Sequence, residues 1–555
     1  MMKKINLSIV FVLLFPSASM AQEEPTTTQT PAAQVEAVVN EAAEVEEEEA
    51  APAIAQTAAE PENYFSYRFS ERADGYQVSD MRLDADGNLF EQNHLVWKRT
   101  TFSPYFALGK RVKLNSELLL VSGYVTLDAP NEKFRQYGVP RNKALSVNMF
   151  NENQSYADQF KVRQFYVEFL SDIGMFRVGR MTSNWGLGLL ANNGDGKSSD
   201  WGHSYLGADR NYGDVVNRFL FATKPFSDKN LPSWLNKVNL VIAADLAERE
   251  YNLSRADGDM AYQGVGALRY KDGDDELGFY GVYRNLSDRN DDYLKARVID
   301  LYGKSSFETS GFKVFGAGEV AYVSGNTSMA KNNAFTDNIA VKQLGYLARL
   351  GSAHLSTGLG IDVEAGYASG DSNPNDGNMR AFSFDNNTNP SLILFDQLRY
   401  LETVAAAAHA SDPEHIGYPQ DSVRLLPNGG SVSNTVYLRP TLRFKMGKFK
   451  FNLAYLKAQT EEENVDPYNS NLAGGTSVNF QGGSGQEKDL GYEINAGIGY
   501  SFDIVDGMTL DLDVQAGLLK PGAAFHNAAG TAHDDITLVF ASLAFHYDAP
   551  HKLKF

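Results

Sequence analysis

The sequence predicts an all-β protein in which residues 63–555 form a single transmembrane antiparallel β-barrel of about eighteen strands. Three observations lead to this prediction. The 555-residue chain is 43% hydrophobic and 12% aromatic and has 48 glycines, a composition that favours pleated sheet with bends. After the N-terminal leader, no run approaches the roughly 20 consecutive apolar residues that a membrane-spanning helix requires. Many segments of about ten residues instead alternate apolar and polar side chains, as barrel strands do.

Residues 1–21 are predicted to be a secretory signal peptide. Lys3 and Lys4 precede an apolar run from Ile5 to Phe15, and small residues surround Ala21. A membrane anchor is the alternative, but about 11 apolar residues form only ~16 Å of helix, roughly half of a bilayer core. The signal indicates export into a bacterial envelope.

Residues 22–62 contain eleven Glu and no basic or aromatic residue. This composition predicts a disordered acidic linker. The linker is either a tether to a periplasmic partner or a solvated spacer.

The strand prediction rests on alternation with a period of two residues. In 508–518, Met508, Leu512 and Leu518 belong to an apolar set that alternates with Asp511 and Asp513. Segments 361–368, 449–455 and 492–502 repeat the pattern. Soluble sandwiches and propellers also alternate, but their strands usually have only about 5 or 6 residues. The predicted strands are 63–73, 98–109, 113–126, 159–170, 174–182, 215–225, 237–249, 261–271, 276–286, 293–305, 311–324, 343–353, 358–370, 433–446, 448–459, 488–502, 508–520 and 536–547.

The connections between these strands alternate long and short. The long 127–158 segment is followed by a tight turn at 171–173, and another tight turn near His354 is followed by the long 371–432 segment. Outer-membrane barrels have this asymmetry, with long external loops and short periplasmic turns. The 226–236 connection is too long for a tight turn and departs from the pattern. The terminal Phe555 resembles the signal read by the barrel-assembly machinery.

Composition excludes several classes of function. A formal charge of −19 argues against nucleic-acid binding, and the absence of cysteine excludes disulfides, thiolate metal sites and a cysteine nucleophile. Nine histidines include His203 beside Ser204 and His533 beside Asp534, but neighbours in an extended chain rarely face each other productively. We therefore expect no enzymatic activity. No plug domain precedes the first predicted strand, which argues against an energised receptor.

A barrel of this size leaves an aqueous channel, and its polar inner face predicts a hydrophilic permeant. The predicted inward charges either line this channel or pair across strands. They are Glu168, Arg177, Lys313, Glu319, Asp362, Glu364, Lys448, Lys450, Glu493, Asp511 and Asp513. Within the 371–432 segment, residues 391–410 have the apolar period of an amphipathic helix. This helix must pack on a loop, the inner wall or a partner, or else act as a gate.

The run DSNPNDGN, residues 371–378, resembles a calcium-binding loop. Gly377 stands at the seventh position rather than the sixth, and the twelfth is Phe382 rather than a bidentate Glu. An ordinary Asn/Gly turn is the preferred interpretation, and a loop-bound Ca²⁺ is the alternative. No other cofactor or metal is predicted.

Two sequence patches carry a family resemblance. One is VGRMTSNWGLG at 178–188, and the other is AGYASGD at 365–371, followed by an Asn/Pro/Asp-rich stretch. Both resemble the alginate-export family of outer-membrane barrels. The resemblance implies an eighteen-stranded channel that exports a polysaccharide, with Arg180 on or near the lumen.

The sequence therefore predicts a passive channel in the bacterial outer membrane, in contact with its lipid. Polysaccharide export is the leading expectation. A general diffusion porin for small solutes, and a structural or adhesive surface barrel, are the alternatives.

Overall fold

The computed structural model describes residues 63–554 except 91–93, 125–159, 195–212, 214, 227–230, 251–252, 256–257, 332–334, 375, 411–425, 427 and 550–552. The predicted signal peptide and linker, at 1–21 and 22–62, lie outside the described residues, as do His203 and Ser204.

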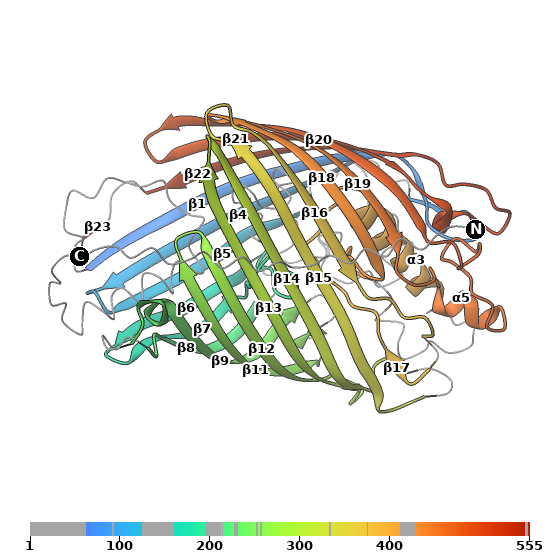
Figure 1. The fold of residues 1–555 in the computed structure, drawn as a ribbon, viewed down its shortest axis with the longest axis horizontal. Helices are drawn as coiled ribbons and strands as arrows, with labels where there is room; N and C mark the ends of the chain where they lie inside the picture. Colours follow the sequence, from blue (N-terminus) through green and yellow to red (C-terminus); the bar gives the residue numbers. More distant parts are fainter. Residues whose placement is uncertain are drawn as a thin grey trace.

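Eighteen antiparallel strands form a closed barrel (Figure 1). The first strand pairs with both the second wall strand and the last: Phe69 lies opposite Phe102 on one side and Tyr547 on the other. Closure leaves no free sheet edge, as a membrane-spanning sheet requires. The wall strands are β1 (Asn63–Val78), β4 (His94–Leu108), β5 (Val112–Tyr124), β6 (Lys161–Ser171), β7 (Gly174–Thr182), β8 (Val215–Thr223), β9 (Val238–Glu250), β11 (Met260–Asp272), β12 (Asp275–Ser287), β13 (Tyr293–Thr309), β14 (Phe312–Thr327), β15 (Ile339–His354), β16 (Leu359–Ala368), β18 (Thr435–Met446), β19 (Phe449–Thr460), β20 (Asp489–Val505), β21 (Met508–Lys520) and β22 (Ile536–Asp548).

The fold class and the strand number are confirmed, and every predicted strand overlaps one wall strand. Boundaries shift by a few residues where strands continue beyond their apolar pattern. The largest extensions are at β1, which continues to Val78, and at β15, which begins at Ile339. Pairing with a long neighbour supports these ends, because backbone hydrogen bonding continues after the side-chain alternation has ended.

Alternation separates an apolar outer face from a polar inner face. On β15, Arg349 is buried inside the barrel, whereas the next residue, Leu350, is 67% exposed. On β21, Leu512 faces outward and Gln515 is buried. Exposed side chains as apolar as Leu350 are favourable only in lipid, so the outer face is the membrane-contacting surface.

Long and short connections fall at opposite ends of the barrel. The helices α3 (Tyr400–Ala410) and α5 (Pro467–Leu472) lie in long connections at the right-hand end of Figure 1. Tight turns, such as the one at Gly447 with φ 58°, lie at the other end. The connection at 224–237 at that end is longer than a tight turn, as its length had indicated, and it contains the short helix η3 (Ser233–Lys237), which was not predicted. Among the described residues, no helix is long and apolar enough to cross a membrane.

Several short strands and helices lie outside the eighteen wall strands. At the chain end, Leu553 of the short strand β23 (Leu553–Lys554) pairs with Phe65 on β1. The other short elements are β2 (Met81–Arg82), β3 (Leu89–Phe90), β10 (Leu253–Ser254), β17 (Asn378–Met379), η5 (Leu394–Arg399) and η7 (Ala523–Phe525).

Candidate functional site in the lumen

The connection between β16 and β18 folds into the barrel. Its described central part, residues 383–410, is called the lumen insert here. The predicted helix is present as η5 followed by α3. Its apolar residues are buried together with inward-facing wall residues such as Tyr437, Leu456 and Phe540. The helix therefore packs on the inner wall and on other loops, one of the arrangements expected for it. The buried insert residues are Leu392, Ile393, Leu394, Phe395, Leu398, Tyr400, Leu401 and Val404.

One wall carboxylate holds the start of the lumen insert. Glu493, on β20, accepts hydrogen bonds from the backbone N–H groups of Leu392 at 2.7 Å, Ile393 at 3.1 Å and Leu394 at 2.8 Å. These donors precede or begin a helical turn, where backbone N–H groups lack intrahelical partners. A buried carboxylate that accepts three N–H groups satisfies them with charge-assisted bonds.

A second loop enters the lumen between β7 and β8. Its described part, residues 183–194, is called the Trp185 loop. Trp185 donates from Nε1 to Asp300 Oδ1 at 2.8 Å and stacks on Tyr280 with ring centroids 5.0 Å apart. The Leu187 N–H donates to the Glu319 carboxylate. Asp300 and Glu319 project from the inner face of β13 and β14, so this loop is also held by wall carboxylates.

Close approach of this loop to the wall requires a glycine. Gly186 has φ +59°, and a Cβ at this position would lie 2.5 Å from Glu319 Oε2. A side chain here would both strain the backbone and push away the carboxylate that binds Leu187. The structure thus explains the glycine at position 186 in the WGLG stretch, residues 185–188.

The Trp185 loop and the lumen insert are hydrogen-bonded to each other. The Asp385 N–H donates to the Leu189 carbonyl at 2.9 Å, and the Asn192 N–H donates to Asp385 Oδ2 at 3.1 Å. Asn387 Nδ2 donates to the Asn192 carbonyl at 3.2 Å. The two loops form one unit, called the loop block, that joins the β13–β14 wall to β20 through the interior.

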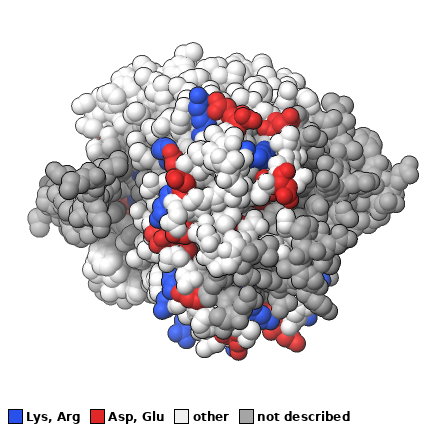
Figure 2. Space-filling view, turned by 90° about the vertical axis from the view of Figure 1, so that its right-hand side faces the viewer, with Lys and Arg blue, Asp and Glu red and all other residues white. Residues whose placement is uncertain are grey.

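The outer connections pack over the loop block. Arg82, from the β1–β4 connection, donates to Gln481 Oε1 at 2.9 Å and to the Phe525 carbonyl at 3.0 Å. Asn464 donates to the Ala524 carbonyl at 2.9 Å and accepts from Arg399 Nη1 at 2.8 Å. Figure 2 looks onto this end of the barrel and shows acidic and basic side chains around an uncharged centre.

Two carboxyls within these loops have raised pKa values. Burial, with a contribution from Asp466, raises the pKa of Glu402 to about 8, although Arg399 lies 3.3 Å away and opposes the shift. Burial raises the pKa of Asp466 to about 6. Both groups are outside the strands, where α3 meets the β19–β20 connection.

Many inward charges form ion pairs across neighbouring strands, which was one of the two expected roles for them. Arg177 contacts Glu168 at 2.8 Å, Arg218 contacts Asp245 at 2.7 Å, and Arg269 contacts Glu276 at 2.5 Å. Each pair lies on the inner face and is buried. These ion pairs link adjacent strands of the wall. Each guanidinium pairs with a carboxylate that would otherwise be buried without a partner.

An arginine cluster lies on the inner face of β15, β16 and β18. Arg349 contacts Asp362 at 3.4 Å, and Arg443 donates to the other Asp362 oxygen. Arg439 is fully buried and lies opposite Glu364 in the strand register. Three guanidinium groups thus share this part of the wall with two carboxylates, and the local charge is positive.

Most of the predicted lumen residues lie on inward rows, and whether any of them contacts a permeant stays a prediction. Glu319 and Glu493 hold loops, and Lys313 contacts Asp274 at 2.7 Å near a turn. The residues on inward rows are Glu168, Arg177, Lys313, Glu319, Asp362, Glu364, Lys450, Glu493, Asp511 and Asp513.

Two predicted lumen residues are elsewhere. Arg180 lies in register with Phe165, which is 52% exposed, so strand parity places Arg180 on the outward row; its Nη1 donates to the Val162 carbonyl at 3.2 Å. Lys448 is in the turn between β18 and β19, where it contacts Asp503. Both predictions of a lumen position were wrong.

Sequence reasoning missed Trp185, Asp300 and the Arg349–Arg439 pair. Arg349 and Arg439 fall within predicted strands, and extending the period-two pattern to them would have placed both inward. No local signal links Trp185 to Asp300, which is 115 residues away.

In the predicted calcium loop, the carboxylates pair with an arginine side chain of the same loop. Arg380 contacts Asp371 at 3.1 Å and Asp376 at 2.8 Å, the carboxylates that would have ligated Ca²⁺. Within the described residues, no three His, Cys, Asp or Glu side chains are grouped to hold a metal ion. A Ca²⁺ site stays a prediction. His533 contacts the carbonyls of Arg82 and Asp534.

A closed barrel with an apolar outer face and a charged inner face is the architecture of a bacterial outer-membrane protein. The chain lies in the bacterial outer membrane.

No protein-family model matches the chain, and no curated protein matches it. Solved structures of similar fold include outer-membrane proteins of Pseudomonas aeruginosa. OprD is 11% identical, with a TM-score of 0.47 over 89% of this chain and 98% of that chain. OccK5 (OpdH) is 11% identical with a TM-score of 0.46, over 87% and 98% of the two chains. OpdK, solved with vanillate, is 8% identical with a TM-score of 0.48, over 87% and 98%. We infer no permeant from likenesses at this level.

Proposed function

We propose that the protein is a passive outer-membrane channel for small hydrophilic solutes, narrowed by the loop block. The observation that carries this proposal is the connection across the lumen: Glu319 on β14 holds the Trp185 loop, Glu493 on β20 holds the lumen insert, and the two loops bond to each other. A polar wall narrowed in this way favours small, hydrated permeants over polymers.

Polysaccharide export was the leading expectation, and neither the comparisons nor the lumen supports it. A polymer would have to displace a block in which Leu394 and Phe395 are fully buried, at the cost of exposing that apolar surface. The alternative expectation of a porin-type channel for small solutes fits the bonded loop block better. A structural barrel would differ from both in conducting nothing.

The test is passage of solutes of graded size into liposomes that contain the purified barrel. Swelling rates with a monosaccharide, a disaccharide and a trisaccharide measure the size limit, and planar bilayers measure conductance. We expect flux of the smallest sugar and a steep loss with size. No flux and no conductance would contradict the proposal.

A deletion variant identifies the element that sets the size limit. Replacing residues 387–430 with a short Gly/Ser linker removes most of the lumen insert, and we expect larger sugars to enter. The matched control replaces the exposed tip at 528–532, which contributes no contact to the loop block, and should keep the original limit. An unchanged limit in the deletion variant would remove the loop block from the proposed mechanism.

A further inference from the structure

Three cations lie together on the membrane-facing surface near the external end of the barrel. Arg297 on β13 lies opposite Ser324 on β14, which lies opposite Lys342 on β15. Lys295 is two residues from Arg297 on the same outward row. Strand geometry places the Cα atoms of Lys295 and Arg297 ~7 Å apart and those of Arg297 and Lys342 ~10 Å apart. Lys295, Arg297 and Lys342 are called the basic patch.

Within the described residues, no carboxylate forms an ion pair with the basic patch; Asp337 accepts a hydrogen bond from the Tyr293 hydroxyl beside Lys295. Among the described residues, Arg297 and Lys342 have no ion-pair partner, and Lys295 contacts the ring of Tyr293, 5.2 Å from its centroid. Two other outward cations near the external end are paired: Lys457 contacts Asp489 at 2.5 Å, and Lys520 contacts Asp535 at 3.6 Å. In a chain with a formal charge of −19, three uncompensated cations in one place indicate an anionic partner.

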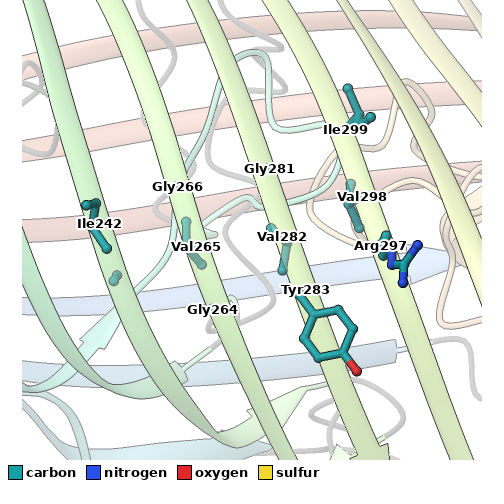
Figure 3. A pocket seen from close by; sticks show the side chains of 11 residues that line it. Ile242, Gly264, Val265, Gly266, Gly281, Val282, Tyr283, Arg297, Val298 and Ile299 are labelled. Carbon is teal, nitrogen blue, oxygen red and sulfur yellow. The ribbon is translucent and has the colours of Figure 1, made fainter.

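A hollow of about 540 Å³ adjoins the basic patch on the same face (Figure 3). Gly264, Gly266 and Gly281 leave outward positions without side chains, and Ile242 and Ile299 stand at its two sides in one register row. A Cβ added at Gly264 or Gly266 would meet nothing within 4 Å. Tyr283 and Arg297 lie side by side at its rim (Figure 3). The hollow is apolar and open to the membrane.

The position of these features corresponds to the outer leaflet. Strands β11–β15 end just beyond the basic patch in the connections assigned to the external side, and exposed tyrosines accompany it, including Tyr262, Tyr283 and Tyr322. Tyrosine is enriched at the boundary between headgroups and acyl chains. Below this level Ile299 and Leu344 face outward. The cations therefore lie at headgroup depth, with the hollow at acyl-chain depth.

We propose that this surface binds a phosphorylated glycolipid of the outer leaflet. The basic patch binds the phosphates of its sugar headgroup, and one acyl chain fills the hollow between Ile242 and Ile299. Arg297 presents several N–H donors to phosphate oxygens in a planar fork, and the two lysines add charge at either side. This lipid site is independent of the solute passage proposed above, because it is on the opposite face of the wall.

The test is native mass spectrometry of the full-length mature barrel in detergent, titrated with bisphosphorylated lipid A. We expect saturable binding of at least one molecule. The K295Q/R297Q/K342Q variant should bind on the order of 100-fold more weakly, because each cation near an anionic headgroup contributes about a fivefold effect. The matched control K457Q/K520Q removes outward cations that are already paired and should bind as the unmodified protein does.

Further measurements distinguish the contribution of the headgroup from that of the acyl chain, and lipid A from another anionic lipid. The G264V/G266V variant fills the hollow without changing charge and should also weaken binding. Lipid A without its phosphates should not saturate the site, and phosphatidylglycerol should bind less tightly than lipid A. Unchanged affinity in the charge variant, or equal affinity for phosphatidylglycerol, would overturn the assignment. Folding of the charge variant is checked by its electrophoretic shift on heating. If that variant does not fold, the K295R/K342R variant, which keeps the charge, must retain binding.

Discussion

Glu493 on β20 accepts a hydrogen bond at 2.8 Å from the backbone N–H of Leu394, at the start of the helical part of the lumen insert. The same carboxylate also accepts from Leu392 and Ile393, so a single wall residue fixes where the insert enters the lumen. Glu319 has the corresponding role for the Trp185 loop on the opposite part of the wall. Strand residues that face inward thus position the loops that, in the proposed function, narrow the channel.

Removal of the Glu493 anchor should loosen the lumen insert. Glu493→Ala leaves three buried N–H groups without their acceptor, and we expect a loss of roughly 3 kcal/mol or more in the stability of the inserted state. Single-channel recordings should show a larger or strongly fluctuating conductance, while the barrel still shifts on heating in gels. Glu487→Ala, at an exposed position of the β19–β20 connection, serves as the comparison and should leave the conductance steady. Identical recordings for Glu493→Ala and the unmodified protein would show that Glu493 does not hold the insert.

The Trp185 side chain should report on the second loop. Trp185→Phe keeps the stacking position on Tyr280 but removes the donor to Asp300, so we expect a loss of roughly 1–3 kcal/mol in loop stability. Limited proteolysis should cut the β7–β8 connection faster in this variant. Trp234→Phe, in the exposed η3 turn at the other end of the barrel, should not change the rate. Equal cleavage of the Trp185 variant and the unmodified protein would contradict the anchoring role.

Closure by the lumen insert should weaken as the pH rises. Burial raises the pKa of Glu402 to about 8, above the ordinary value of 4.5. Because the folded state holds the proton more tightly than the unfolded state, the insert is most stable below about pH 4.5 and loses stability up to about pH 8. Recordings between pH 5 and 9 should therefore show more frequent openings at high pH.

The variant Glu402→Gln isolates this effect. It should flatten the response between about pH 6 and 8 and leave only the response below about pH 6, where Asp466, with a pKa raised to about 6, still titrates. A Glu402→Gln protein with the full pH response would assign the effect to another group.

The outer face of β15 around Leu350, away from Lys342 at its external end, should tolerate no charge. Leu350→Arg places a cation among lipid chains, and we expect a loss of up to about 4 kcal/mol in barrel stability. Folding titrations in urea with lipid vesicles measure this loss. Leu355→Arg, in the turn after β15 and 50% exposed, is the control and should cost little. Equal stabilities for the two variants would mean that Leu350 does not face hydrocarbon.

The strand framework could be predicted from the sequence, because its cause is local. A strand with lipid on one side and water on the other must alternate, so Leu350 beside Arg349 and Leu512 beside Asp511 already indicate the two faces. Loop lengths then indicate which end is external. The error at Arg180 had a different origin: the family resemblance placed it at the lumen, whereas its register with the exposed Phe165 places it on the outward row.

The contents of the lumen depended on contacts between distant segments. The sequence indicated that residues 391–410 form an apolar helix that needs a partner, but not which one. Glu493 binds it from about 100 residues away, and Asp385 joins it to Leu189. Likewise Arg297 and Lys342 become neighbours only through strand register. The sequence by itself determined a barrel and its two faces, because alternation is a property of each strand; closure of the barrel decided which side chains meet, because only the pairing of strands sets those distances.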